Sequence, residues 1–124
     1  MTLEIVSKVF NFIRGAVRGI NGYEDFSNIN FLIVGVEGPG KELTKWLGST
    51  PGASIFFTND PLYALRQYQE VLKIDPSARY WEEKDCVDIV IDNLKEKIII
   101  RGKMFSFEDL VEDSYTQGIH EFYL

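Results

Sequence analysis

The stretch NINFLIVGVEGPGKELTKWL, residues 28–47, decides how this chain folds. Residues 31–36 are an unbroken apolar run, which is typical of a strand buried on both faces in the centre of a parallel sheet. Gly35 near its end, and then Gly38, Pro39 and Gly40, break the run within six residues. From Lys41 the apolar residues recur at helical spacing, and Gly48 is a suitable C-terminal cap. The stretch therefore predicts a buried strand, a tight turn and a helix.

Four further strands are predicted from short apolar runs. Residues 53–58, ASIFFT, form a second buried strand that follows the first after one helix. Two strands joined in this way form a right-handed parallel crossover when they share a sheet. Residues 86–92 and 97–101 are separated by a short polar segment, which is typical of a hairpin. Residues 119–124, IHEFYL, are expected to form the last strand.

Helices are expected on both sides of this sheet. Apolar residues recur at helical spacing in residues 2–20, and residues 60–73 open with a good N-cap followed by proline. Together with the helix that begins near Lys41, a fourth helix is predicted for residues 107–117, ending at Gly118 as a capping glycine. We therefore expect one α/β domain over residues 1–124, with a mixed sheet of about five strands, a parallel centre, an antiparallel hairpin and helices on both faces.

Residues 1–22 contain an amphipathic helix that either packs on the domain or forms a dimer contact. Its apolar residues cover about half of the circumference, whereas Lys8, Arg14 and Arg18 lie on the other side. Packing on the sheet is the first interpretation, and a homodimer through residues 3–20 is the second. Attachment to a membrane surface through the three cations is the third.

The composition excludes several classes of function. One cysteine and one histidine among 124 residues exclude a disulfide framework and a His/Cys zinc site. No apolar run approaches the ~20 residues of a transmembrane segment, and the N-terminus lacks the pattern of a secretory signal. The net charge is −6, and residues 104–124 contain five acidic residues and no lysine or arginine, which is unsuited to nucleic acid. The expectation is a cytoplasmic protein without a metal or cofactor.

The turn after the first strand carries a recognisable motif. Residues 35–41, GVEGPGK, match the first seven positions of the pattern G-x-x-x-x-G-K-[ST]. The turn resembles the phosphate-binding loop of P-loop NTPases, which implies a nucleotide or phosphate held by the loop backbone and a lysine. The residues that this resemblance assigns are Gly35, Gly38, Gly40 and Lys41. The resemblance stops at Glu42, where the pattern has a hydroxyl for Mg²⁺, and the glycine order differs from the dinucleotide fingerprint G-x-G-x-x-G.

Acidic and aromatic residues in the second half of the chain indicate a surface for a partner. Tyrosine and tryptophan dominate binding hot spots, and carboxylates suit a basic protein. The candidate partner-binding residues are Tyr80, Trp81, Glu82, Glu83, Glu108, Asp109, Glu112 and Asp113. No nucleophile–base or acid–base pair can be assigned, which favours a protein that is not an enzyme. The sequence thus predicts a non-catalytic acidic binding or regulatory protein, comparable to an inhibitor or immunity protein, that engages a basic protein partner. A nucleotide- or phosphate-binding protein is the alternative.

Overall fold

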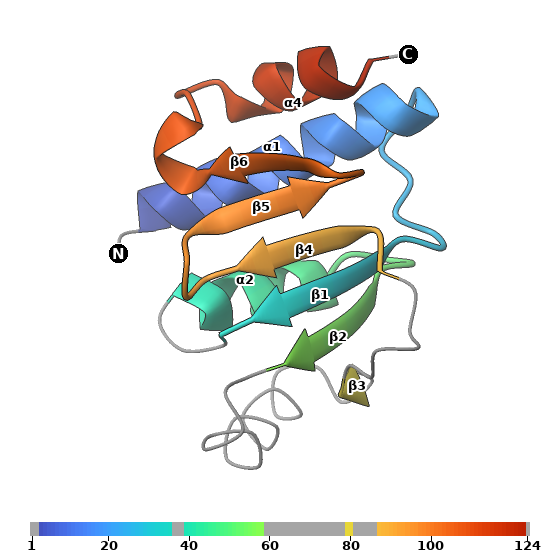
Figure 1. Cartoon of the computed structure of the whole chain (residues 1–124). Helices are drawn as coiled ribbons and strands as arrows, with labels where there is room; N and C mark the ends of the chain where they lie inside the picture. Colours follow the sequence, from blue (N-terminus) through green and yellow to red (C-terminus); the bar gives the residue numbers. More distant parts are fainter. Residues whose placement is uncertain (1–2, 36–38, 59–78, 81–86, 124) are drawn as a thin grey trace.

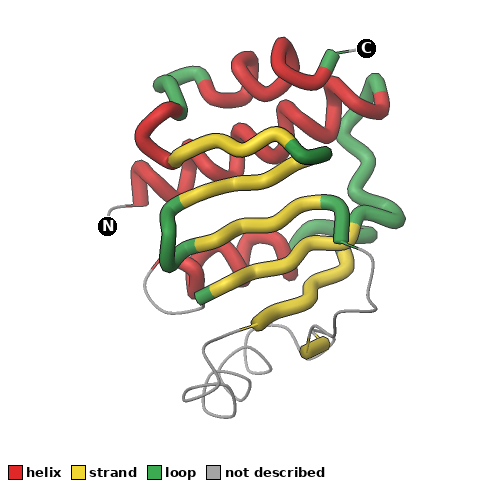
Figure 2. Tube along the Cα trace, viewed as in Figure 1, coloured by secondary structure: helices red, strands yellow, loops and turns green. Residues whose placement is uncertain are grey.

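The computed structural model of the chain describes residues 3–35, 39–58, 79–80 and 87–123 (Figures 1 and 2). Its helices are α1 (Leu3–Asn21), α2 (Pro39–Gly48) and α4 (Ser114–Phe122), with one 3₁₀ turn, η1 (Phe107–Asp109). Its strands are β1 (Asn30–Val34), β2 (Ser54–Thr58), β3 (Arg79–Tyr80), β4 (Ile89–Asp92), β5 (Lys97–Ile100) and β6 (Lys103–Ser106).

The strands form one mixed sheet in the order β3-β2-β1-β4-β5-β6. β1 pairs in parallel with β2 and with β4, and the two-residue β3 extends the parallel part beyond β2. β5 runs antiparallel to both β4 and β6. The predicted α/β domain is confirmed, with its parallel centre and its antiparallel hairpin. The strand β6 lies where the sequence predicted only a turn.

One face of the sheet carries the main core. Phe31 and Ile33 of β1 stand beside Ile89 and Ile91 of β4, and all four side chains are buried. α1 and α2 both lie over this face (Figure 1). Their contribution to the core consists of Val6, Val9, Phe12, Ile13, Ala16, Val17, Leu43 and Leu47. The apolar stripe of α1 is therefore buried within its own chain.

The opposite face carries a second apolar row, one side chain from each of five neighbouring strands. The row runs through Phe56, Leu32, Val90, Ile99 and Met104 in register. Exposure rises along it, from the buried Phe56 and Leu32 to Met104, which is 60% exposed. The helix predicted for residues 60–73 lies outside the described residues. Within the described part of the chain, both helices that cover the sheet lie on the face of Phe31.

The C-terminal part of the sequence prediction was wrong. The predicted helix over residues 107–117 is a 3₁₀ turn followed, after a break, by α4, which continues to Phe122. The strand predicted for residues 119–124 does not form, because its first residues belong to α4. Gly118 does not end a helix. It lies inside α4 and is buried, and its lack of a side chain serves contact with α1.

α1 and α4 pack with their backbones in close contact (Figure 1). A Cβ atom added to Gly118 would collide with the carbonyl oxygen of Phe12 and lie 2.7 Å from the backbone nitrogen of Ala16. A Cβ atom added to Gly15 would likewise collide with the carbonyl oxygen of Tyr115. Gly15 lowers the intrinsic helix propensity of α1, yet its lack of a side chain lets α4 approach the helix.

Candidate functional site

The turn after β1 is fixed by a side chain from the neighbouring strand. Gly35 is buried with a φ of +80°, a conformation that other residues rarely adopt. Its carbonyl accepts a hydrogen bond of 2.9 Å from Asn93 Nδ2, and the Asn93 backbone N–H donates to the carbonyl of Val34 at 2.8 Å. Because β1 and β4 are parallel neighbours, both turns leave the sheet at the same edge. Asn93 therefore ties the two turns together.

The start of α2 packs tightly on this turn. Gly40 is buried, and a Cβ atom there would collide with the Gly35 carbonyl and lie 2.7 Å from Asn93 Nδ2. The hydroxyl of the buried Thr44 donates to the Gly40 carbonyl at 2.7 Å, which fixes the first turn of the helix. Gly35 and Gly40 are therefore both required by the packing of the chain itself, whether or not a ligand binds there.

Of the other two residues predicted to bind phosphate, the structure describes only one. Gly38 lies outside the described residues, and Lys41 is exposed on α2. Asn93 uses its amide N–H on Gly35, and its Oδ1 atom is buried without a hydrogen-bond partner within the described residues. A carboxamide oxygen is an acceptor and does not attract a phosphate oxygen. Phosphate binding by Gly35, Gly38, Gly40 and Lys41 stays a prediction.

Residues 107–113, here called the acidic segment, bring four candidate carboxylates together. Glu108 and Asp109 lie on η1, and Glu112 and Asp113 follow just before α4. All four residues are exposed. Ser106 caps η1 by accepting a hydrogen bond from the Glu108 backbone N–H at 3.3 Å. The segment is thus a short, exposed acidic connection between β6 and α4.

Contacts on both sides hold the acidic segment in place. Gln117 of α4 accepts from the Val111 N–H at 2.9 Å and donates to the Asp109 carbonyl at 3.1 Å. Leu110 is buried in the core, whereas the neighbouring Val111 is 53% exposed. Within the described residues, the carboxylates of Glu108, Asp109 and Glu112 form no ion pair. Their charges are therefore directed at solvent and not at the protein.

Asp113 has a structural role at the start of α4. Its carboxylate accepts from the Thr116 hydroxyl at 2.7 Å and from the Thr116 backbone N–H at 3.2 Å, which caps the helix. These two bonds, the one from the hydroxyl first, hold the pKa of Asp113 below its ordinary value. Among the four acidic candidates of this described segment, Asp113 is thus the one whose carboxylate stabilises the fold.

The aromatic half of the predicted partner surface lies almost entirely outside the described residues. Tyr80 belongs to β3, where its backbone pairs with Phe57. Trp81, Glu82 and Glu83 are not among the described residues. Their assignment to partner binding stays a prediction.

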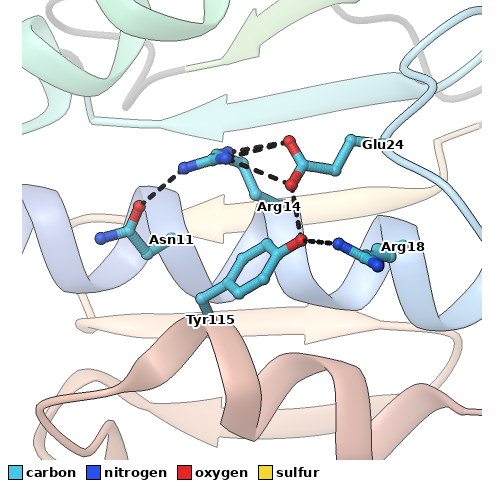
Figure 3. A network of polar contacts seen from close by, with 5 residues as sticks. All are labelled: Asn11, Arg14, Arg18, Glu24 and Tyr115. Atoms are coloured by element: carbon cyan, nitrogen blue, oxygen red, sulfur yellow. Dashed lines mark hydrogen bonds and ion pairs between the residues drawn. The ribbon is translucent and has the colours of Figure 1, made fainter.

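A polar network that the sequence analysis missed joins α1 and α4 to Glu24, which lies in the loop directly after α1 (Figure 3). Arg14 of α1 binds the carboxylate of Glu24 at 3.0–3.1 Å, and the Tyr115 hydroxyl of α4 donates to Glu24 Oε1 at 2.6 Å. Arg18 donates to the Tyr115 oxygen at 2.9 Å. The Tyr115 bond first, and then Arg14, hold the pKa of Glu24 below its ordinary value. No local sequence signal indicates this network, because Glu24 and Tyr115 are 91 positions apart.

The network includes Arg14 and Arg18, two of the cations that the sequence analysis considered for attachment to a membrane surface. Arg14 and Arg18 bind within the chain, and Lys8 forms a 3.6 Å ion pair with Glu4 one helical turn away. The apolar side of the same helix is buried against the sheet. A homodimer through residues 3–20 stays a prediction, and it would have to use what these contacts leave exposed.

The described residues hold no group of three or more His, Cys, Asp and Glu side chains placed to bind a metal ion. Within the same part of the chain, no helix has the length and apolar character needed to cross a membrane. Comparisons with models of protein families, with curated proteins and with solved structures find no match to this chain.

Proposed function

We propose that the chain is a non-catalytic binding protein that engages a basic protein partner through the acidic segment. The observation that carries this proposal is the set of exposed carboxylates of Glu108, Asp109 and Glu112, which have no cationic partner within the described residues. The three negative charges of the acidic segment repel each other, and binding of a basic partner reduces this repulsion. Electrostatic attraction of this kind accelerates association and selects partners by their charge.

The acidic segment has two further properties of an interaction surface. It is held in one conformation by Gln117 and by the buried Leu110, so little conformational entropy is lost on binding. Val111 offers an exposed apolar side chain between the acidic residues. An apolar centre with a charged rim is the usual arrangement of a protein interface.

A charge-neutralised variant tests the proposal. Glu108→Gln, Asp109→Asn and Glu112→Gln are combined, while Asp113 is retained because it caps α4. The control combines Glu4→Gln, Glu96→Gln and Glu121→Gln, which removes the same charge from other exposed positions. Binding to poly-lysine is measured by calorimetry at low and at high salt. Each exposed ion pair contributes ~0.2–1 kcal/mol, so the first variant should bind roughly tenfold more weakly than the control.

The comparison with the control distinguishes binding through the acidic segment from attraction by the net charge of the whole protein. Equal loss of affinity in both variants would show that net charge alone drives binding, and this result would refute the proposal. Affinity capture from the source cell then identifies the partner. The expected partner is a basic protein that the control variant retains and the neutralised variant loses.

A further inference from the structure

Two hollows that share lining residues lie where α1 ends, β4 begins and β5 turns into β6. These three parts of the chain lie at the same end of the sheet (Figure 1). The larger has a volume of about 290 Å³ and the smaller about 180 Å³. Ile20 and Arg101 line both of them. The walls of the larger hollow are mainly aliphatic, and include Val17, Ile29, Val87, Ile89 and Ile100. At ~30 Å³ per water molecule, the larger hollow has room for roughly ten waters, or for a small organic molecule of similar volume.

The charged groups at the hollows belong to four residues. Arg101 and Lys103 provide two cations, and Asp88 and Glu121 provide two carboxylates. The Lys103 ammonium donates to the Glu121 carbonyl at 3.1 Å and lies 5.4 Å from the Phe122 ring centroid. Asp88 Oδ2 accepts from the backbone N–H of Asn30 at 2.8 Å. Lys103 and Asp88 are thus both engaged by the protein.

Arg101 differs from its charged neighbours because it has no partner among the described residues. Within residues 3–35, 39–58, 79–80 and 87–123, no hydrogen bond, ion pair or ring contact holds its guanidinium. Its backbone has a φ of +51° in the two-residue turn between β5 and β6, with Gly102 at +77°. Turns of this type favour asparagine, aspartate or glycine at the first position. An arginine there is conformationally costly, and its exposed side chain stands where the two hollows meet.

We propose that these hollows form a binding site for a small carboxylic acid with an apolar body. The aliphatic walls receive the body, and the Arg101 guanidinium pairs with the carboxylate, for which its planar donors are well suited. The carboxylate of Asp88, which also lines the larger hollow, repels the anion and limits its affinity. This site is separate from the acidic segment and does not depend on the function proposed for that segment.

Titration with hexanoate and hexan-1-ol, followed by amide chemical shifts, tests the site. The two probes share an apolar chain and differ in the charge of the head group. Hexanoate should bind several-fold more tightly, with saturable shifts concentrated at Ile29, Val87 and Gly102. Hexanoate shifts that do not saturate, or that spread over the surface lysines, would overturn the proposal.

Three variants assign the binding to Arg101. Arg101→Asn should fold at least as well as the parent, because asparagine tolerates a positive φ, yet bind hexanoate about fivefold to tenfold more weakly. Lys95→Gln removes a cation from the other hairpin turn and should leave binding unchanged. Asp88→Asn keeps the acceptor for Asn30 and should strengthen hexanoate binding without affecting hexan-1-ol. Equal hexanoate affinity of Arg101→Asn and Lys95→Gln would overturn the assignment.

Discussion

The close contact between α1 and α4 makes Gly118→Ala a demanding test of the packing. The new Cβ atom would lie 2.7 Å from the Ala16 nitrogen, 0.7 Å short of the 3.4 Å at which ordinary van der Waals contact begins. It would also collide with the Phe12 carbonyl oxygen. Both obstacles are backbone atoms of α1, which cannot rotate aside as a flexible side chain can. The helices therefore have to move apart.

The cost of this movement follows from the contacts that it loosens. A gap of 0.5–1 Å forfeits a quarter to a half of the dispersion attraction across it, and overpacked cores lose ~1–3 kcal/mol. The rings of Phe12 and Phe122, whose centroids are 6.3 Å apart, bridge these helices and would separate. Because alanine has the higher helix propensity, replacing glycine by alanine stabilises the helix itself by ~1 kcal/mol and offsets part of this loss. Taking the upper end of the overpacking range, we expect Gly118→Ala to lower the free energy of unfolding by about 2 kcal/mol.

Urea unfolding monitored by circular dichroism measures this change, with His120→Ala as the control. His120 is exposed on the same helix, so alanine there should leave stability unchanged or raise it slightly. Combining Gly15→Ala with Gly118→Ala should cost less than the sum of the two, because one separation of the helices relieves both clashes. If Gly118→Ala is as stable as the parent chain, helix propensity outweighs packing and the close approach of the helices is refuted.

Three further predictions concern the polar network, the cap of α4 and the predicted phosphate site. Tyr115→Phe removes the hydroxyl that is hydrogen-bonded to both Glu24 and Arg18. The free energy of unfolding should fall by ~0.5–1 kcal/mol, which lowers the melting temperature. An unchanged melting temperature would show that the network does not stabilise the fold. Asp113→Ala should destabilise the protein near neutral pH, whereas Asp113→Asn keeps the cap. The pKa of Asp113 is lower in the folded protein than in the unfolded chain. The stabilisation by its charge is therefore present above the ordinary aspartate pKa and is lost as pH falls through the pKa of the folded state. The free energies of unfolding of the parent and of Asp113→Ala should consequently converge in acid. Lys41→Ala should leave both the melting temperature and its response to ATP and inorganic phosphate unchanged, and a phosphate-dependent shift lost in this variant would establish the phosphate site instead.

The parts of the fold that the sequence predicted are those specified by local patterns. The apolar run at the centre of β1 and the change of period at Lys41 were sufficient to predict a buried strand and α2. The segments around Ile89 and Ile98 were recognised as a hairpin because their strands are adjacent in sequence. Each of these signals depends on residues close together in the chain.

The parts that were missed depend on distant residues. Gly118 was interpreted as a helix end because glycine is a common C-terminal cap. Its role is instead set by the backbone of α1, about a hundred positions earlier in the chain. The network around Tyr115, and the hollow lined by both Arg101 and Asp88, likewise arise from the topology. The acidic segment could be delineated from composition alone, since acidic residues that are close in sequence remain close in any fold. Its role in partner binding stays a prediction.

The pairing of β1 with β4 has a consequence for how the chain folds. The bond between Asn93 and Gly35 spans 58 residues, and the contact of Arg18 with Tyr115 spans 97. The hairpins β4–β5 and β5–β6 close much shorter loops and can form first, because loop closure costs more entropy as the loop lengthens. The central strand of the sheet is then completed only when distant segments meet, which slows folding relative to a helical bundle of the same size. Substitutions across the α1–α4 contact should accordingly alter the unfolding rate more than the folding rate, as expected for interactions that form late.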